Sequence, residues 1–215
     1  KETALKLAKE ITPRARAIGA ANTLTFLPDG GFLADNTDGI GFINNVKQNA
    51  PDWQADRGPA LILGAGGACR AVLWSLLDAG VPSILLANRT RSRAEGLAEE
   101  FGDKVHAIDW VDISEATREA ATVVNTTSLG MKNQPPLEIT LNSAKDMLVT
   151  DIVYTPLKTD LILQAEGKGL SIVDGLGMLL HQAVPGFEKW FGIRPEVTRE
   201  LRQVLLDDLG EAEND

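Results

Sequence analysis

The chain has 215 residues, of which 44% are hydrophobic, and its formal net charge is −9. That length is sufficient for one large domain or two small ones, and the negative charge disfavours nonspecific binding to nucleic acid or to anionic membranes. No apolar run reaches the roughly 18 residues that span a bilayer, and we expect no secretory signal from the charged, amphipathic start of the chain.

Residues 1–38 are predicted to form a helix over 2–11, a polar turn and strands near 22–27 and 31–34. From Pro59 onward, short apolar runs alternate with amphipathic runs, which predicts strands separated by helices. The predicted strands are 60–63, 83–87, 104–108, 122–126, 147–153 and 170–174, and the predicted helices are 67–79, 91–101, 114–120 and 159–167. Three of these helices are followed by a glycine suited to a left-handed cap: Gly80, Gly102 and Gly167.

Beyond Asp174 we expect a helical tail. Its first part is interrupted or kinked at Pro185, because proline breaks the hydrogen-bond ladder of a helix. Pro195 suits the first turn of a last helix that reaches about Leu209, and the acidic end 211–215 is expected to fray.

The strand segments are short and continuously apolar, as in parallel sheets that helices cover on both faces. Right-handed crossovers then bring the carboxyl ends of all strands to one edge, where ligands bind. We therefore predict an α/β fold: a doubly wound parallel sheet of the Rossmann type over 39–174. Residues 1–38 and the tail 175–215 would form a smaller, second α/β domain for substrate.

The strand at 60–63 runs directly into Gly64-Ala65-Gly66-Gly67, and a helix follows. In a dinucleotide-binding turn Gly64 would allow the tight bend and Gly66 the approach of a pyrophosphate, which the N–H groups at the helix start would bind. The third glycine position holds Cys69, so an ordinary glycine turn is the alternative. Cys69 is the only cysteine, which favours a reducing, cytoplasmic compartment.

The loop after the second strand of this unit points to the type of dinucleotide. NAD-binding units carry an Asp or Glu there for the ribose 2′-hydroxyl, whereas this chain has Asn88. Arg89, Arg91 and Arg93 follow, and guanidinium groups bind phosphate bidentately. NADP is therefore expected rather than NAD, with either Arg91 or Arg93 being merely a solvated residue of the next helix.

Seven short peptides occur along the chain in the following order: Gly19–Thr23, Asn36–Gly39, Gly64–Gly67, Asn88–Thr90, Asn125–Met131, Asp151–Pro156 and Gly175–Gln182. With them the chain closely resembles the shikimate dehydrogenase family, NADP-dependent reductases of 3-dehydroshikimate in chorismate and aromatic amino-acid biosynthesis. The resemblance covers nearly all 215 residues. Quinate/shikimate dehydrogenases share most of these peptides, so quinate or another cyclic hydroxy acid remains an alternative substrate.

The resemblance implies a catalytic pair, Lys1 and Asp38. A lysine ammonium can donate the proton that turns a ketone into an alcohol, and Asp38 would hold both the lysine and the new hydroxyl. In the family this lysine follows an Asn-x-Thr-x-Pro peptide, so we expect an upstream part with a carboxylate-binding Ser-x-Ser motif to be absent and this chain alone to be poorly active. Without the resemblance, Lys1 is a mobile terminal residue and Asp38 a turn residue.

The resemblance also implies substrate contacts from Asn22, Tyr154 and Gln182. A strand cap, a core phenol and a polar helix face are the respective alternatives. The implied cofactor contacts are Gly64, Ala65, Gly66, Gly67, Ala68, Asn88, Arg89, Thr90, Arg93, Thr126, Thr127, Ser128, Ile152, Gly175 and Met178.

No metal site is expected, because the only two histidines, His106 and His181, lie far apart in the sequence. We expect small molecules as partners, with no nucleic acid or membrane, and a monomer or homodimer. A nonenzymatic NADP-binding module is the alternative from a different functional class.

Overall fold

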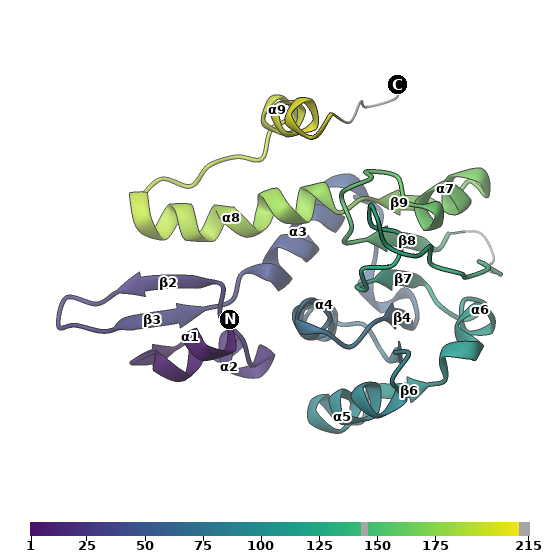
Figure 1. The fold of residues 1–215 in the computed structure, drawn as a ribbon, viewed down its shortest axis with the longest axis horizontal. Helices are drawn as coiled ribbons and strands as arrows, with labels where there is room; N and C mark the ends of the chain where they lie inside the picture. The colour runs from purple at the N-terminus through teal and green to yellow at the C-terminus, as the bar shows by residue number, and fades with distance from the viewer. Residues whose placement is uncertain (143–145, 211–215) are drawn as a thin grey trace.

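The computed structural model describes residues 1–142 and 146–210 of the chain. Two β-sheets organise it, and the long helix α8 (Leu176–Phe191) runs from one to the other (Figure 1). The smaller sheet has the strand order β1–β3–β2 and is flanked by two short helices. Its elements are α1 (Glu2–Leu7), β1 (Glu10–Ile11), α2 (Pro13–Ile18), β2 (Thr23–Phe26) and β3 (Phe32–Asp35).

The larger sheet has six parallel strands in the order β6–β5–β4–β7–β8–β9. They are β4 (Ala60–Leu63), β5 (Ile84–Ala87), β6 (Val105–Ile108), β7 (Thr122–Asn125), β8 (Leu148–Asp151) and β9 (Ser171–Val173). The chain reverses its direction of winding between β4 and β7, which in such sheets is the point where ligands bind. This arrangement confirms the predicted doubly wound α/β fold.

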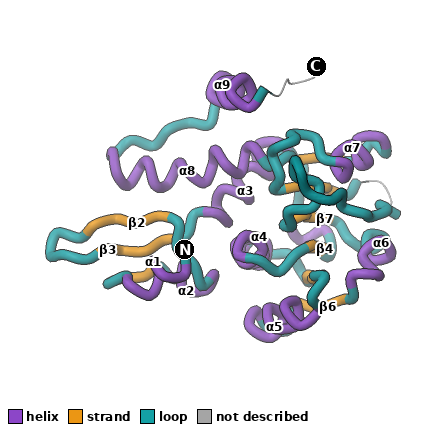
Figure 2. Tube along the Cα trace, in the orientation of Figure 1, coloured by secondary structure: helices purple, strands orange, loops and turns teal. Residues whose placement is uncertain are grey.

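Helices cover both faces of the larger sheet (Figure 2). Ile62 packs with α3, α4 and α5 on one face, whereas its neighbours Leu61 and Leu63 pack with α6 and α7 on the other. Since adjacent residues of one strand point to opposite buried faces, the strand must be apolar throughout. The remaining helices are α3 (Asp38–Asn49), η1 (Ala55–Arg57), α4 (Gly67–Asp78), α5 (Arg91–Phe101), η2 (Trp110–Asp112), α6 (Ile113–Ala116), α7 (Asp160–Gly167) and α9 (Arg199–Leu209).

The N-terminal part differs from the prediction in two places. The helix expected over 2–11 ends at Leu7, and Glu10–Ile11 instead pair with β3. The expected polar turn contains α2, because Thr12 accepts a hydrogen bond from the Ala15 N–H and Pro13 takes the first helical position. Helix α3 was not expected at all. Its polar sequence is stabilised by packing against α4 and α8.

The tail also differs, since α8 continues through Pro185 without a break. Proline removes the hydrogen bond to the carbonyl four residues earlier, but Val184, Pro185 and Gly186 are buried, and this packing maintains the helix. The last helix begins at Arg199 rather than Pro195, because the Thr198 hydroxyl caps its start.

Two predicted helix ends are corrected as well. The helix expected over 114–120 stops at Ala116. Gly167 is the last residue of α7, and the left-handed conformation is taken two residues later by Gly169, with φ +68°. Gly80 and Gly102 have positive φ, but Gly102, with ψ −170°, lies outside the left-handed helical region that a left-handed cap requires. The acidic end 211–215 lies outside the described residues.

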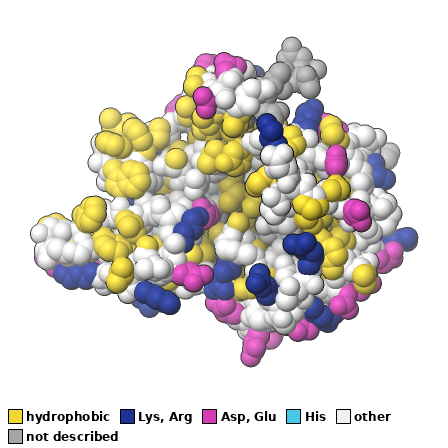
Figure 3. All heavy atoms as spheres, viewed as in Figure 1, with side chains coloured by type: hydrophobic (Ala, Val, Ile, Leu, Met, Phe, Trp, Pro, Cys, Tyr) yellow, Lys and Arg dark blue, Asp and Glu magenta, His cyan; other side chains and the backbone are white. Residues whose placement is uncertain are grey.

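Large apolar side chains are exposed at the end of α8 that lies farthest from the six-stranded sheet, and on the neighbouring β2–β3 hairpin (Figure 3). The residues are Phe26, Phe187, Trp190, Phe191 and Ile193. No helix of the described residues has the length and apolar character needed to traverse a lipid bilayer.

Candidate active site

Lys1 and Asp38 form an ion pair although 37 positions separate them in the chain. The lysine Nζ lies 2.6 Å from Asp38 Oδ2. Asp38 stands in the first turn of α3, where the positive end of the helix dipole favours a carboxylate, and its N–H donates to Asn36 Oδ1. The side chain of Asp38 is 9% exposed and that of Lys1 is 54% exposed. A fixed carboxylate therefore holds an ammonium group that solvent can reach.

Asn22 connects this pair to α8. Its Nδ2 donates to Asp38 Oδ1 at 2.8 Å and to Gln182 Oε1 at 3.1 Å. Its Oδ1 accepts from the Thr37 N–H at 2.9 Å, which sets the orientation of the amide. The structure thus places Asn22 beside the predicted catalytic pair, and the hydrogen bonds of its amide are made within the protein. A direct contact between Asn22 and substrate stays a prediction.

Helices α3 and α8 cross closely, and this crossing brings Gln182 to Asn22 and Asp38. A Cβ at Gly41 of α3 would lie 2.7 Å from the Gln182 Cβ and 2.8 Å from the Met178 carbonyl oxygen. A Cβ at Gly177 of α8 would likewise collide with the Asn45 side chain. Only glycine at both positions allows α3 and α8 to approach this closely, which brings Gln182 within hydrogen-bond distance of Asn22.

A cavity of about 170 Å³ adjoins the pair. Its lining combines residues from four parts of the chain: Lys1, Asp38, Ile152, Tyr154, Gly175, Met178, Leu179 and Gln182. All but Leu179 belong to the predicted site. Lys1 is the only cation among these lining residues. A larger cavity of about 360 Å³, lined by Trp53 and Arg57 among others, lies where β8 and β9 begin, at the opposite edge of the sheet.

The glycine loop after β4 has the geometry of a ligand-binding turn. Gly64 has φ +105°, and a Cβ there would lie 2.8 Å from Thr126 Oγ1 of the neighbouring loop. By contrast, a Cβ at Gly66 or Gly67 would meet nothing within 4 Å. The space beside Gly66 and Gly67 at the start of α4 is therefore open, which would leave room for a pyrophosphate at the helix N-terminus.

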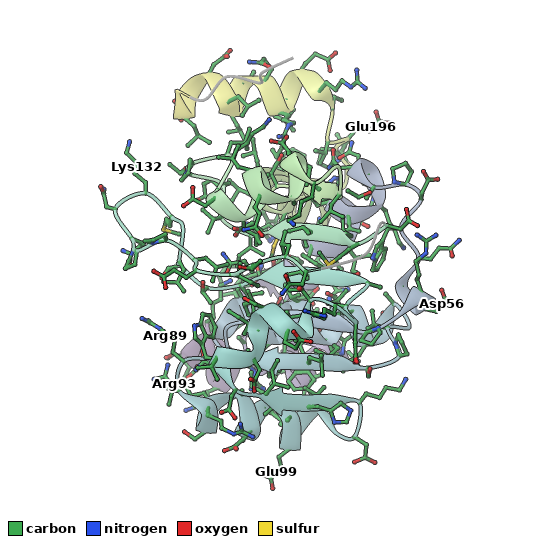
Figure 4. All side chains as sticks on the ribbon, turned by 90° about the vertical axis from the view of Figure 1, so that its right-hand side faces the viewer. Asp56, Arg89, Arg93, Glu99, Lys132 and Glu196 are labelled. Atoms are coloured by element: carbon green, nitrogen blue, oxygen red, sulfur yellow. The ribbon has the colours of Figure 1, made fainter. Side chains whose placement is uncertain are left out.

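The three arginines that follow β5 differ in their ion-pair partners. Arg91 pairs with Glu95 at 2.8 Å and with Asp109, so it is a structural residue of the first helical turn. Arg89 and Arg93 have no ion-pair partner among the residues that the structure describes, and Figure 4 shows both projecting from the same side of the molecule. Asn88 donates to the Thr90 carbonyl at 2.9 Å and shapes the turn.

The loops after β7 and β8 are joined by a buried pair that was not among the predicted site residues. Asn125 Nδ2 donates to both carboxylate oxygens of Asp151, at 3.0 and 3.1 Å. Asn125 Oδ1 accepts from Thr127, and Asp151 accepts from the Val153 N–H and from Thr159. Burial raises the pKa of Asp151, and these hydrogen bonds oppose that shift.

This pair connects the predicted cofactor contacts Thr126–Ser128 to the cavity residues Ile152 and Tyr154. Asn125 and Asp151 each open one of the seven family-like peptides, directly at a strand end. A polar residue at the end of an otherwise apolar strand is the sequence feature that could have identified Asn125 and Asp151 as site residues.

Two family models match the chain: shikimate/quinate 5-dehydrogenase over residues 45–153, and the shikimate 5′-dehydrogenase C-terminal domain over residues 175–206. The NADP(+) shikimate dehydrogenase of Ruegeria sp. (strain TM1040) is 56% identical over 207 residues, which are 96% of this chain and 75% of that protein. The chain belongs to the shikimate dehydrogenase family. Its curated relatives are NADP-dependent oxidoreductases.

Solved structures of the shikimate dehydrogenase family share the fold. The shikimate 5-dehydrogenase of Thermus thermophilus, in complex with NADP(H) and shikimate, is 38% identical with a TM-score of 0.75, over 91% of this chain and 71% of that one. The quinate dehydrogenase of Corynebacterium glutamicum, in complex with NAD, is 30% identical with a TM-score of 0.88, over 96% and 74%. The predicted family and fold are therefore confirmed.

Proposed function

We propose that this protein catalyses the reversible reduction of 3-dehydroshikimate to shikimate with NADPH. The observation that carries the proposal is the 2.6 Å contact between Lys1 and Asp38 at a cavity that the residues of the strand-end loops also line. Membership of the shikimate dehydrogenase family supports the substrate class. In this reading the pathway is the formation of chorismate and aromatic amino acids.

The acid–base pair would work on the carbonyl oxygen. NADPH supplies the hydride that the carbonyl carbon receives. The Lys1 ammonium donates a proton to the oxygen as its negative charge develops, so the ketone becomes an alcohol. Asp38 keeps the ammonium in place, and solvent can return the lost proton because Lys1 is half exposed. In the reverse direction Lys1 accepts the hydroxyl proton.

Tyr154 and Gln182 line the same cavity and would contact the other ring hydroxyls. The Nε2 amide group of Gln182 can donate hydrogen bonds to these hydroxyls, because it is the Oε1 atom that accepts the hydrogen bond from Asn22. A cofactor nicotinamide would lie near Ile152, Gly175 and Met178 of the same cavity. The division of labour is then a cofactor domain over 39–174 and a substrate domain from 1–38 and 175–215.

The residues present fit NADP. Gly66 and Gly67 leave room at the start of α4 for the pyrophosphate, and no carboxylate stands at Asn88 to repel a 2′-phosphate. Arg89 and Arg93 would supply the charge that binds it. Thr126, Thr127 and Ser128 would contact the cofactor from the next loop.

A second substrate, quinate, has support from one observation. The quinate dehydrogenase of Corynebacterium glutamicum is among the similar structures, and a Lys–Asp pair would serve either ring alcohol equally well. We place shikimate first because the relatives that are 56% and 58% identical to this chain are shikimate dehydrogenases.

Steady-state kinetics test the proposal directly. In the intact protein we expect oxidation of shikimate with NADP⁺ and reduction of 3-dehydroshikimate with NADPH, and a lower kcat/KM for quinate. A higher kcat/KM for quinate than for shikimate would show that quinate, and not shikimate, is the preferred substrate. Tight NADPH binding with turnover of none of these compounds would favour a nonenzymatic NADP-binding module.

We further propose that the protein lies in the cytoplasm. A single, fully buried cysteine, Cys69, suits the reducing cytoplasm, where thiols stay free. Burial raises the pKa of its thiol to about 12, so it is not a reactive thiolate. We infer a monomer or homodimer, and sedimentation equilibrium would distinguish these two states from larger assemblies.

A further inference from the structure

Arg70 joins the two parts of the chain that carry the proposed chemistry. It lies in the first turn of α4, the helix that begins at the glycine loop, and α4 lies beside α2 (Figure 1). We propose that Arg70 is a positioning residue that holds the segment 18–22, and through it Lys1 and Asp38, in register with the cofactor-binding end of α4. The inference rests on the proposed function.

The guanidinium group makes three kinds of contact. Its Nε donates to the Ile18 carbonyl oxygen at the end of α2. Its two terminal nitrogens donate to Glu100 of α5, one of them at 2.7 Å, and its carbon lies 5.6 Å from the centre of the Phe101 ring. A planar fork held on two sides has little freedom, so the Nε–carbonyl bond has a fixed direction.

The packing around Arg70 is equally restrictive. Ile18 and Ala20 are buried against Ala71, the next residue of α4, with Trp74 beside them. Gly19 has φ +74°, and a Cβ there would lie 2.9 Å from an Arg70 terminal nitrogen. The arginine thus fits directly against the backbone turn that ends α2.

Each residue after this turn holds a part of the catalytic pair. The Ala20 carbonyl accepts from Asn36 Nδ2 at 3.0 Å, and the same Asn36 accepts the Asp38 N–H. The Ala21 N–H donates to the Lys1 carbonyl at 3.2 Å.

The next residue completes the connection, since Asn22 donates to Asp38 Oδ1. Fixing the Ile18 carbonyl therefore fixes both members of the pair relative to α4. Because Arg70 contacts neither Lys1 nor Asp38, its effect on the reaction would be one of geometry alone.

The matched variants are Arg70→Met, Arg70→Lys and Glu100→Gln. Arg70→Met removes the donor to Ile18, Arg70→Lys retains one donor and the charge, and Glu100→Gln weakens the exposed ion pair while leaving the Ile18 bond. We expect kcat for 3-dehydroshikimate to fall about tenfold in Arg70→Met, because misplacement of reacting groups costs up to about 10²-fold. NADPH affinity should stay within about twofold of the wild-type value.

Three further readouts separate positioning from simple stability. With NADPH deuterated at C4, the isotope effect on kcat should rise in Arg70→Met, since hydride transfer becomes slower relative to product release. Arg70→Lys should recover most of the lost kcat, and Glu100→Gln should retain it. Amide hydrogen exchange at Ala21 and Asn22 should accelerate in Arg70→Met but not in Glu100→Gln.

The outcomes are distinguishable. An unchanged isotope effect with equal losses in Arg70→Met and Glu100→Gln would mean that Arg70 only stabilises the fold. A loss of NADPH affinity that matches the loss of kcat would place Arg70 in cofactor binding, and either result overturns the proposal. If Arg70→Met does not fold, the polar variant Arg70→Gln takes its place, and hydrogen exchange at Ala21 that is no faster in Arg70→Gln than in Glu100→Gln also overturns the proposal. A wild-type protein without turnover rejects the proposed function, whereas the exchange measurement still decides the role of Arg70.

Discussion

Gly39 of α3 lies directly against Ala71 of α4. A Cβ at Gly39 would come within 2.8 Å of the Ala71 carbonyl oxygen and within 3.1 Å of the Ser75 Cβ. Asp38 precedes Gly39, and α4 begins at the glycine loop. This single contact therefore helps to set the distance between the proposed acid–base pair and the glycine loop that we propose binds the cofactor phosphates.

Gly39→Ala should move the start of α3 and with it Asp38. Overpacking of this kind costs about 1–3 kcal/mol of unfolding free energy, and we expect kcat to fall as well. Gly96→Ala is the matched control, because a Cβ at this exposed position of α5 meets nothing within 4 Å and should stabilise the helix slightly. Urea unfolding and steady-state kinetics measure both effects. Equal stability of the two variants would show that the close approach is not limiting.

In the intact protein, Lys1→Ala and Asp38→Asn should each reduce kcat by about 10²–10⁴-fold, the typical contribution of a positioned proton donor. NADPH affinity should change little, since neither residue lies on the glycine loop. The losses should be strongly non-additive in the double variant, because residues that act as one unit fail together. A double-mutant cycle measures this coupling. Fully multiplicative losses would mean that Lys1 and Asp38 act independently.

Arg89→Ala should weaken NADPH binding and leave NADH binding nearly unchanged. Loss of a charged phosphate contact costs about 1.5–3 kcal/mol, which is roughly ten- to a hundredfold in affinity. Arg91→Ala is the control, because Arg91 is already paired with Glu95 and Asp109. Fluorescence titration with each cofactor measures the affinities. The assignment fails if Arg89→Ala weakens both cofactors equally or if Arg91→Ala has the larger effect on NADPH.

Asp35 should make the fold sensitive to acid. Burial would raise its pKa, but hydrogen bonds from Arg14, Lys189 and Thr12 outweigh burial and lower the pKa from 3.8 to about 2. A lowered folded-state pKa stabilises the protein above the unfolded value, and this contribution disappears as the pH falls from about 4 towards 2. The shift corresponds to about 2 kcal/mol.

Asp35→Asn should therefore lower the unfolding free energy at pH 6, and the difference from the wild type should shrink below pH 4. Urea unfolding at several pH values measures it. Because Lys189 belongs to α8 and Arg14 to α2, the variant should also loosen the contact between α8 and the smaller sheet. A difference that stays constant down to pH 3 would exclude Asp35 as the titrating group.

The architecture of the larger sheet could be predicted from local patterns in the amino-acid sequence. Residues of β4 are apolar on both faces, Gly64 follows at once, and helix α4 comes next. These are local features, set by interactions within a few residues, and they predict a parallel strand followed by a phosphate-binding turn. The absence of a carboxylate at Asn88 is equally local, which is why the cofactor type could be read from the chain.

The assembly of the candidate site, by contrast, depends on contacts between elements that lie far apart in the sequence. Asn22 meets Gln182 across 160 positions because glycines in α3 and α8 allow the helices to cross closely. The continuity of α8 through Pro185 has the same origin, since burial of that segment compensates for a missing backbone hydrogen bond. Such contacts depend on how whole elements pack together, and a local pattern contains no information on the register in which distant elements meet.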